Sequence, residues 1–188
     1  MPLPRLSKSM IAAAWAGIFA VGLGAGWTGY RGARERIVDG LMDDVKRCAL
    51  AFEPSEVQRL TGTPADVSQP GYLALKRKLF DLQGVNRHVR SVFLLRFDPG
   101  RGGVLYLADS TPVGLKEEAL PGTEFPFAAD LPGLQLIARA GVTATDGSLA
   151  GGAESWLTGY AQIAESPSGK PDEPRREMVG MNLAATEW

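Results

Sequence analysis

The sequence holds few residues of the kinds that usually carry out covalent chemistry. His88 is the only histidine and Cys48 the only cysteine among 188 residues. A Ser-His-Asp or Cys-His mechanism would have to use His88, and one cysteine allows neither an intramolecular disulfide nor a Cys-based zinc or haem attachment motif. A histidine without a second ligand nearby is more often structural or exposed than metal-binding. We therefore predict no cofactor and no metal.

The carboxylates and glycines do not complete a catalytic site either. Asp43 and Asp44 are adjacent, and adjacent helical positions point in different directions, so they do not form a catalytic pair. The glycines of the long loop belong to no GxxxxGK[ST] phosphate loop. We expect that this chain is not an enzyme. A membrane-anchored enzyme with a carboxylate-only mechanism, using Asp109 or Glu154, is the weakest of three functional hypotheses.

The charge balance argues against a nucleic-acid partner. The net charge is −1, with 20 basic and 21 acidic side chains. Two of the basic residues, Arg5 and Lys8, precede residue 31, which leaves 18 basic against 21 acidic side chains in the rest of the chain. A protein that binds nucleic acid needs a basic face that neutralises phosphates. We predict that this chain has no nucleic-acid partner.

An uncharged stretch at residues 10–30 is the clearest organising feature of the chain. These residues read MIAAAWAGIFAVGLGAGWTGY. As a helix rising about 1.5 Å per residue, the stretch would be about 30 Å long, the thickness of a hydrocarbon core. A cleavable signal peptide, which has a shorter apolar region and a small-residue cleavage site, is the alternative. We predict a cytoplasmic N-terminus at 1–9 and a transmembrane helix at 10–30 in the inner (cytoplasmic) membrane.

The region after this stretch predicts helices followed by an antiparallel sheet. One apolar stripe at helical spacing predicts a helix over 31–52, nearly continuous with the span; its members are Ile37, Leu41, Val45, Cys48 and Phe52. A helix restart at 54, a loop at 61–66 and a Leu-rich helix ending near Gly84 follow, with Lys76 placed away from the apolar face. Alternating segments predict strands at 89–97, 104–109, 155–163 and 177–183, with a short helix at 131–139 and a short strand at 142–144. The predicted class is α+β with about five strands.

This order of elements resembles the extracytoplasmic PAS-like (single Cache, also called PDC) sensor domains of bacterial membrane receptors. The resemblance covers about residues 31–188. It rests on TGTPAD at 61–66, YLALKRKLFDLQGVNRHVRSVFLL at 72–95, LADS at 107–110, SWLTGYAQI at 155–163 and VGMNLAATEW at 179–188. Domains of this family feed histidine kinases, diguanylate cyclases or chemoreceptors. The resemblance implies a second membrane helix and an output module beyond Trp188, with 31–188 as the extracytoplasmic domain.

The resemblance also implies where a ligand would bind, between the sheet and the helices and loop that cover it. Arginine beside an aromatic ring would suit a carboxylate or another small anion, whereas Asp109 near Trp156 and Tyr160 would suit an amine. For each aromatic residue alone, a place in an ordinary strand core is the simpler reading. The candidate ligand-binding residues are Arg87, Arg90, Tyr106, Asp109, Ser110, Trp156, Thr158 and Tyr160.

Two functional hypotheses therefore lead. The first is a membrane-anchored sensory input domain that binds a small ligand and passes the signal through the helix at 10–52, within a homodimer. The second is a ligand-free, membrane-tethered dimerisation or partner-protein interaction module. A space between sheet and loop that is filled by the protein's own side chains would favour the second hypothesis.

Overall fold

The computed structural model describes residues 8–101, 103–126, 128–148, 156–167 and 174–184, and within α1 the side chains of 8–14, 16, 18, 20 and 30 are not described. The helices are α1 (Lys8–Leu50), α2 (Pro54–Gln58), α3 (Pro70–Val85) and α4 (Pro132–Ala140), with 3-10 helices η1 (Pro64–Ser68) and η2 (Ala128–Asp130). The strands are β1 (Val89–Asp98), β2 (Gly103–Asp109), β3 (Ala144–Ser148), β4 (Trp156–Ser166) and β5 (Arg175–Ala184).

The chain divides into two compact units, residues 1–39 and residues 40–188. The first unit consists of the N-terminal part of α1, on which Trp15, Phe19 and Trp27 are exposed. Within the described residues, no helix is long and apolar enough to cross a membrane. The span expected at 10–30 falls partly on side chains outside the described set, and it stays a prediction. As predicted, the helix continues without a break from this stretch to Leu50.

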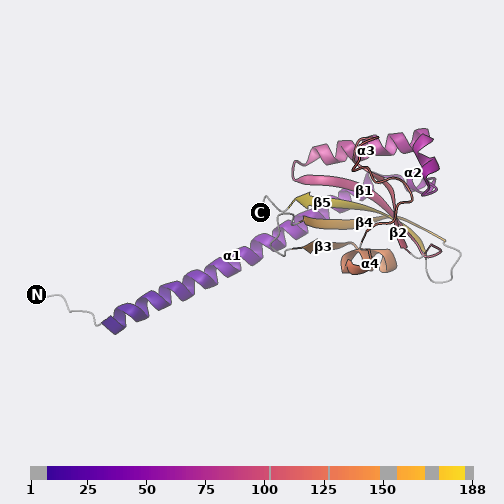
Figure 1. Ribbon diagram of the computed structural model, residues 1–188. Coiled ribbons are helices and arrows are strands. Elements are labelled where there is room, and N and C mark those ends of the chain that lie inside the picture. Colours follow the sequence, from indigo (N-terminus) through magenta and orange to yellow (C-terminus); the bar gives the residue numbers. More distant parts are fainter. Residues whose placement is uncertain (1–7, 102, 127, 149–155, 168–173, 185–188) are drawn as a thin grey trace, which may run out of the picture. The chain divides into compact units, whose positions relative to one another are not determined.

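The second unit is built on a five-stranded antiparallel sheet with the order β2-β1-β5-β4-β3 (Figure 1). All four strand pairs are antiparallel. The prediction of an α+β domain with about five antiparallel strands is therefore confirmed. The β1–β2 hairpin is also confirmed; its turn is fixed by Asp98, whose carboxylate accepts a hydrogen bond from the Gly100 amide at 3.0 Å and whose carbonyl accepts one from the Arg101 amide at 3.0 Å.

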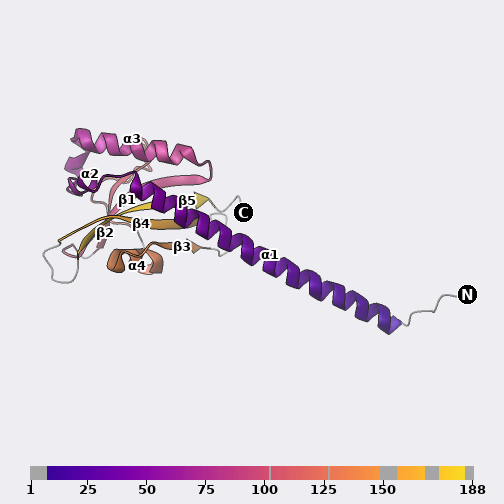
Figure 2. The same cartoon turned by 180° about the vertical axis from the view of Figure 1, so that it is seen from behind.

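One face of the sheet is covered by α3 and by the end of α1 (Figure 2). In α3 the residues Tyr72, Leu75 and Leu79 recur every three or four positions and are buried, which is the period of a helix with one apolar face. In α1 the predicted stripe is buried at Leu41, Val45 and Cys48. A Cβ at Gly159 in β4 would lie 2.9 Å from Leu41 Cγ, so the missing side chain lets this helix approach the sheet closely.

The other face of the sheet is covered by α4. The carboxylate of Asp146 accepts hydrogen bonds from the amides of Gly133 and Leu134 at 2.7 and 2.8 Å. These amides belong to the first turn of α4 and have no partner within the helix, so an acceptor there stabilises the helix start. Gly141 ends the helix in the left-handed conformation, with φ of 69°, which glycine adopts at no steric cost.

Two local predictions are wrong. The expected loop at 61–66 runs into the 3-10 helix η1, because the Asp66 carboxylate accepts bonds from the amides of Thr61 and Gly62 at 3.0 and 2.8 Å and folds the segment back on itself. Burial opposes the charged form of Asp66, yet the hydrogen bonds from residues 61–63 lower its pKa on balance. The short strand expected at 142–144 lies instead at Ala144–Ser148, where the β4 edge supplies a pairing partner.

Candidate functional site

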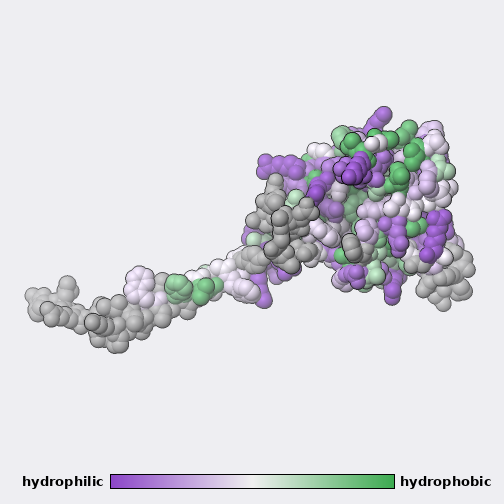
Figure 3. All heavy atoms as spheres, viewed as in Figure 1, coloured by the Kyte–Doolittle hydropathy of each residue, from purple (hydrophilic) through white to green (hydrophobic). Residues whose placement is uncertain are grey.

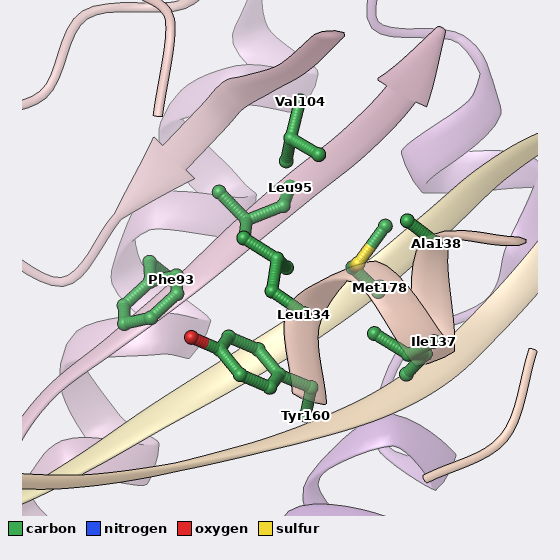
Figure 4. Packing of buried hydrophobic residues seen from close by; sticks show 8 residues of the cluster. All are labelled: Phe93, Leu95, Val104, Leu134, Ile137, Ala138, Tyr160 and Met178. Atoms are coloured by element: carbon green, nitrogen blue, oxygen red, sulfur yellow. The ribbon is translucent and has the colours of Figure 1, made fainter. Parts of the chain in front are cut away.

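The space between the sheet and α4 is where the resemblance places a ligand, and described side chains fill it. Figure 4 shows the cluster, which we call the α4 core. Half-buried aromatic residues extend it toward β2: the ring of Phe125 lies 5.7 Å from that of Phe93 and 5.1 Å from that of Tyr106, centroid to centroid. The α4 core consists of Phe93, Leu95, Val104, Leu134, Ile137, Ala138, Tyr160 and Met178, each at most 3 % exposed.

Tyr160, one of the predicted ligand residues, is a member of this core. Its hydroxyl end points toward Phe93 (Figure 4). Burial raises the pKa of Tyr160 and the nearby Asp146 carboxylate raises it further, with Thr158 acting in the opposite direction. The glycine at 180, opposite Tyr160 in the neighbouring strand, leaves room for the Phe93 ring, which a Cβ there would overlap. Tyr160 therefore acts as a packing residue in this structure.

Thr158 belongs to a polar row that crosses the sheet beside the α4 core. The Thr158 hydroxyl donates to the side-chain carbonyl of Asn182, and the Asn182 amide donates to the Ser91 hydroxyl at 3.1 Å. The three residues are register partners on β4, β5 and β1. Since Thr158 is buried and hydrogen-bonded within the sheet, the row ties three strands together.

Tyr106 and Ser110 are also engaged by their own domain. Tyr106 packs edge-on against Phe93 with ring centroids 6.0 Å apart, and burial together with Asp109 raises the pKa of its phenol to about 12. The Ser110 hydroxyl accepts a hydrogen bond from the Val92 amide at 3.1 Å. Tyr106 therefore packs against the α4 core, and Ser110 is hydrogen-bonded to the neighbouring strand.

Asp109 forms a buried charge cluster that sequence reasoning missed. Lys76 Nζ lies 2.9 Å from Asp109 Oδ1 and 2.7 Å from Glu118 Oε1. All three side chains are nearly inaccessible to solvent, with exposures of 6 to 9 %. The free oxygens accept backbone hydrogen bonds, at Asp109 from the Ala119 amide (3.1 Å) and at Glu118 from the Gly114 amide (2.7 Å). Through Glu118 and Ala119, the cluster therefore attaches the loop at 111–120 to Lys76 of α3 and Asp109 of β2.

The electrostatics of this cluster favour the ionised form of Glu118. Burial opposes the charged form of Glu118, but the bonds from Lys76 and Gly114 lower its pKa on balance. The neighbouring carboxylates act on Tyr72 in the opposite sense: burial, then Glu118 and Asp109, raise the pKa of its hydroxyl. The Tyr72 hydroxyl finds no hydrogen-bond partner among the described residues.

The remaining candidates lie away from the α4 core. Trp156 is half-buried at the start of β4, opposite Ser148 and Ala184. Arg90 is exposed near the start of β1, and Arg87 is exposed in the segment between α3 and β1. The structure therefore brings Tyr106, Thr158 and Tyr160 to the α4 side of the sheet. It places Asp109 against α3 on the other side, and the two arginines lie apart from the α4 core.

Arg87 lines an open cleft on the opposite side of the sheet, which we call the Arg87 cleft. Its volume is about 540 Å³, within the range of small-molecule sites, which lie between about 300 and 1,000 Å³. It lies among the end of α1, the C-terminal end of α3 and the segment that enters β1. The lining residues are Asp44, Arg47, Cys48, Leu82, Val85, Asn86, Arg87, His88 and Met181.

The polar rim of this cleft carries a surplus of positive charge. Two guanidinium groups, of Arg47 and Arg87, face one carboxylate, of Asp44. Arg47 Nη1 and Asp44 Oδ1 are 4.0 Å apart, and Arg87 Nε donates to His88 Nε2 at 3.3 Å. The ion pair is exposed and contributes little to stability, so these side chains can turn toward an incoming anion at little cost.

The floor of the cleft is apolar, from α3, β5 and Cys48. Burial raises the pKa of the Cys48 thiol to about 12, with a further contribution from Asp44. The thiol is therefore protonated at neutral pH and behaves as a small apolar group, as predicted. A charged rim over an apolar floor is suited to a ligand with an anionic head and an aliphatic tail.

The described parts of the chain hold no metal centre. No group of three or more His, Cys, Asp or Glu side chains there could hold a metal ion. Comparison of the chain with protein-family models, with curated proteins and with solved structures finds no match.

Proposed function

We propose that the chain is the sensory input domain of a bacterial membrane receptor of the PAS-like, single Cache type. In this proposal residues 10–30 anchor it in the cytoplasmic membrane and residues 31–188 lie on the extracytoplasmic side. The five-stranded antiparallel sheet, flanked by helices in the expected order, supports the proposal, as does the uncharged stretch at 10–30. The chain itself carries out no catalysis; a histidine kinase or diguanylate cyclase module would supply the output.

The observation that carries this proposal is the position of the Arg87 cleft beside α1. Asp44, Arg47 and Cys48, which form one wall of the cleft, all belong to that helix. The other walls come from α3, from β5 and from the segment that precedes β1. A ligand that touches both walls would bind differently to two positions of α1, and such differential binding is what any ligand-driven switch requires. The signal would pass along α1.

The chemistry of the cleft suggests a short aliphatic carboxylate as its ligand. The carboxylate would accept hydrogen bonds from the guanidinium groups of Arg47 and Arg87, which are suited to bidentate contacts. The aliphatic part would contact Leu82, Val85 and Met181. An amine would meet two positive groups and one carboxylate, so amines should bind more weakly than carboxylates of the same length.

A thermal-unfolding screen of the full chain tests this proposal. Butyrate and hexanoate should raise the melting temperature, and butylamine should not. A ligand at 100 times its dissociation constant stabilises the folded state by about 2.7 kcal/mol.

The matched variants are Arg87→Gln, which should abolish the shift, and Arg90→Gln, which should preserve it. Arg90 is exposed, lies three residues away and does not line the cleft. Equal shifts in both variants, or no shift with the wild-type protein, would count against a carboxylate site in the cleft.

A second candidate function is a ligand-free interaction module tethered to the membrane. The α4 core favours it, because described side chains fill the space between sheet and α4 where a ligand was expected. If no carboxylate, amine or amino acid stabilises the chain, this candidate becomes the better account. Its signal would then come from a bound protein rather than from a small molecule.

A further inference from the structure

Helix α3 presents a solvent-facing stripe that its own domain does not cover. Leu73 and Phe80, seven residues apart, are 48 % and 55 % exposed. A spacing of seven returns to nearly the same side of a helix. Figure 3 shows hydrophobic surface gathered over this part of the molecule. We call the following exposed residues the α3 stripe: Leu73, Ala74, Arg77, Phe80, Asp81 and Gly84.

The charged members of the stripe have no partner within the described chain. Arg77 and Asp81 are exposed, and neither forms a hydrogen bond or an ion pair with a described residue. Arg77 and Asp81 lie beside Leu73 and Phe80 on the helix and leave these two apolar side chains exposed to solvent. Single exposed apolar residues are ordinary on protein surfaces, but two on one helical stripe, bordered by two small residues and two opposite unpaired charges, form a surface that fits a partner.

The stripe is complementary to itself when two copies of α3 pack antiparallel. If a two-fold axis crosses the helices at the level of residue 79, Arg77 lies opposite the partner's Asp81. By the same symmetry Leu73 lies opposite the partner's Val85, which is 83 % exposed, and Ala74 lies opposite the partner's Gly84. Phe80 lies one residue from the level of the axis, so the two Phe80 side chains lie about 3 Å apart along the helix axes, on the same edge of the interface. The small residues let the two backbones approach closely at both ends.

We propose that a second copy of this chain docks antiparallel on the α3 stripe, forming a two-fold symmetric dimer. Such an interface uses the same patch on both subunits. A helix of 16 residues is about 24 Å long, and one helix pair buries less surface than the roughly 800 Å² per partner of a standard interface. The dimer is therefore weak in dilute solution. Two copies confined to one membrane would meet at a higher effective concentration.

Charge reversal tests this dimer directly. Sedimentation equilibrium of the detergent-solubilised full chain should show a monomer–dimer equilibrium that Arg77→Asp weakens at least tenfold, since the introduced carboxylate would face that of the partner's Asp81. The double variant Arg77→Asp with Asp81→Arg should restore the wild-type constant, because the opposite charges face each other again. Arg90→Asp, an exposed reversal outside the stripe, is the matched control and should change nothing.

A cysteine at the axis gives an independent measurement. Phe80→Cys should form an intermolecular disulfide under mild oxidation, whereas Lys116→Cys, on the exposed loop at 111–120, should not. A wild-type chain that stays monomeric at all concentrations would overturn the proposal. So would a dimer that Arg77→Asp leaves unchanged, a loss that the double variant does not restore, or equal cross-linking at positions 80 and 116.

Discussion

The two faces of the sheet differ in how completely their own side chains fill them. On the α4 side, Tyr160 and Met178 are fully buried among leucines and phenylalanines, and the predicted ligand residues there serve packing. On the α1–α3 side, helices cover the sheet as well, but they leave the Arg87 cleft at one end. Aromatic and polar residues on one strand face therefore do not by themselves indicate a pocket. A space between helices that meet the sheet at different places is more informative.

A change in the buried charge cluster should cost more stability than the same kind of change at the protein surface. Lys76→Met would leave Asp109 and Glu118 buried next to each other without their cation. Removal of one partner from a buried ion pair costs about 3–5 kcal/mol. We expect a loss of this size in urea unfolding at pH 7. Lys78→Met, the matched control, removes a half-exposed pair with Glu56 and a hydrogen bond to the Ala51 carbonyl, and it should cost clearly less than Lys76→Met, about 1 kcal/mol. Similar losses for the two variants would mean that the cluster is not buried in solution.

Shortening one leucine on each side of the sheet would test whether the α4 side is closed and the cleft side open. Leu134→Ala in the α4 core should destabilise the protein by about 2–5 kcal/mol, because it opens a cavity in a fully buried cluster. Leu82→Ala at the half-buried wall of the Arg87 cleft should cost clearly less, since water can reach that wall, and it should weaken hexanoate binding. Urea unfolding and calorimetric titration measure the two effects. A reversed order of stability losses would contradict the view that the α4 side is closed and the cleft side open.

The sequence predicted the strands of the sheet well, but it did not predict the buried charge cluster. Alternation predicted the strands and the hairpin, because each strand has neighbours in the sheet that bury its alternate residues. Lys76 was placed away from the apolar face of its helix, together with Arg77 and Lys78, yet the structure buries it. Its partners, Asp109 and Glu118, lie 33 and 42 residues further along the chain, and no local pattern indicates that contact.

The residues of the Arg87 cleft are also far apart in the sequence, so no local pattern predicts that they lie together. The sequence named Arg87 as a ligand candidate together with Tyr106 and Tyr160, whereas the structure places Arg87 in a cleft on the other side of the sheet from those two residues. Its neighbours in the cleft, Asp44 and Arg47, come from a helix about 40 residues earlier and approach only after α1 packs on the sheet. No local pattern indicates them, because charged residues occur along this helix from Arg31 to Arg47 and nothing sets Asp44 and Arg47 apart from the others.

A smaller, pH-dependent effect should come from Glu118. Its pKa is lowered in the folded state by Lys76 and Gly114. Its contribution to stability is therefore present above the unfolded-state pKa, about 4.3, and is lost as the pH falls through the folded-state value. At pH 7, Glu118→Gln should cost about 1.5–3 kcal/mol, the size of a hydrogen bond to a charged group. The difference from wild type should shrink below about pH 4. A difference that stays constant with pH in urea unfolding would show that the Glu118 charge does not hold the loop.

The central claim, that a ligand binds in the Arg87 cleft and not against the α4 core, is tested most directly by two methionines on the two faces. Met181 lines the cleft, and Met178 is fully buried in the α4 core. In the full chain labelled with 13C at its methionine methyl groups, titration with hexanoate should shift the Met181 signal and leave the Met178 signal in place, and Arg87→Gln should remove the shift. A titration that moves Met178 and leaves Met181 unchanged, or that moves neither, would contradict the claim.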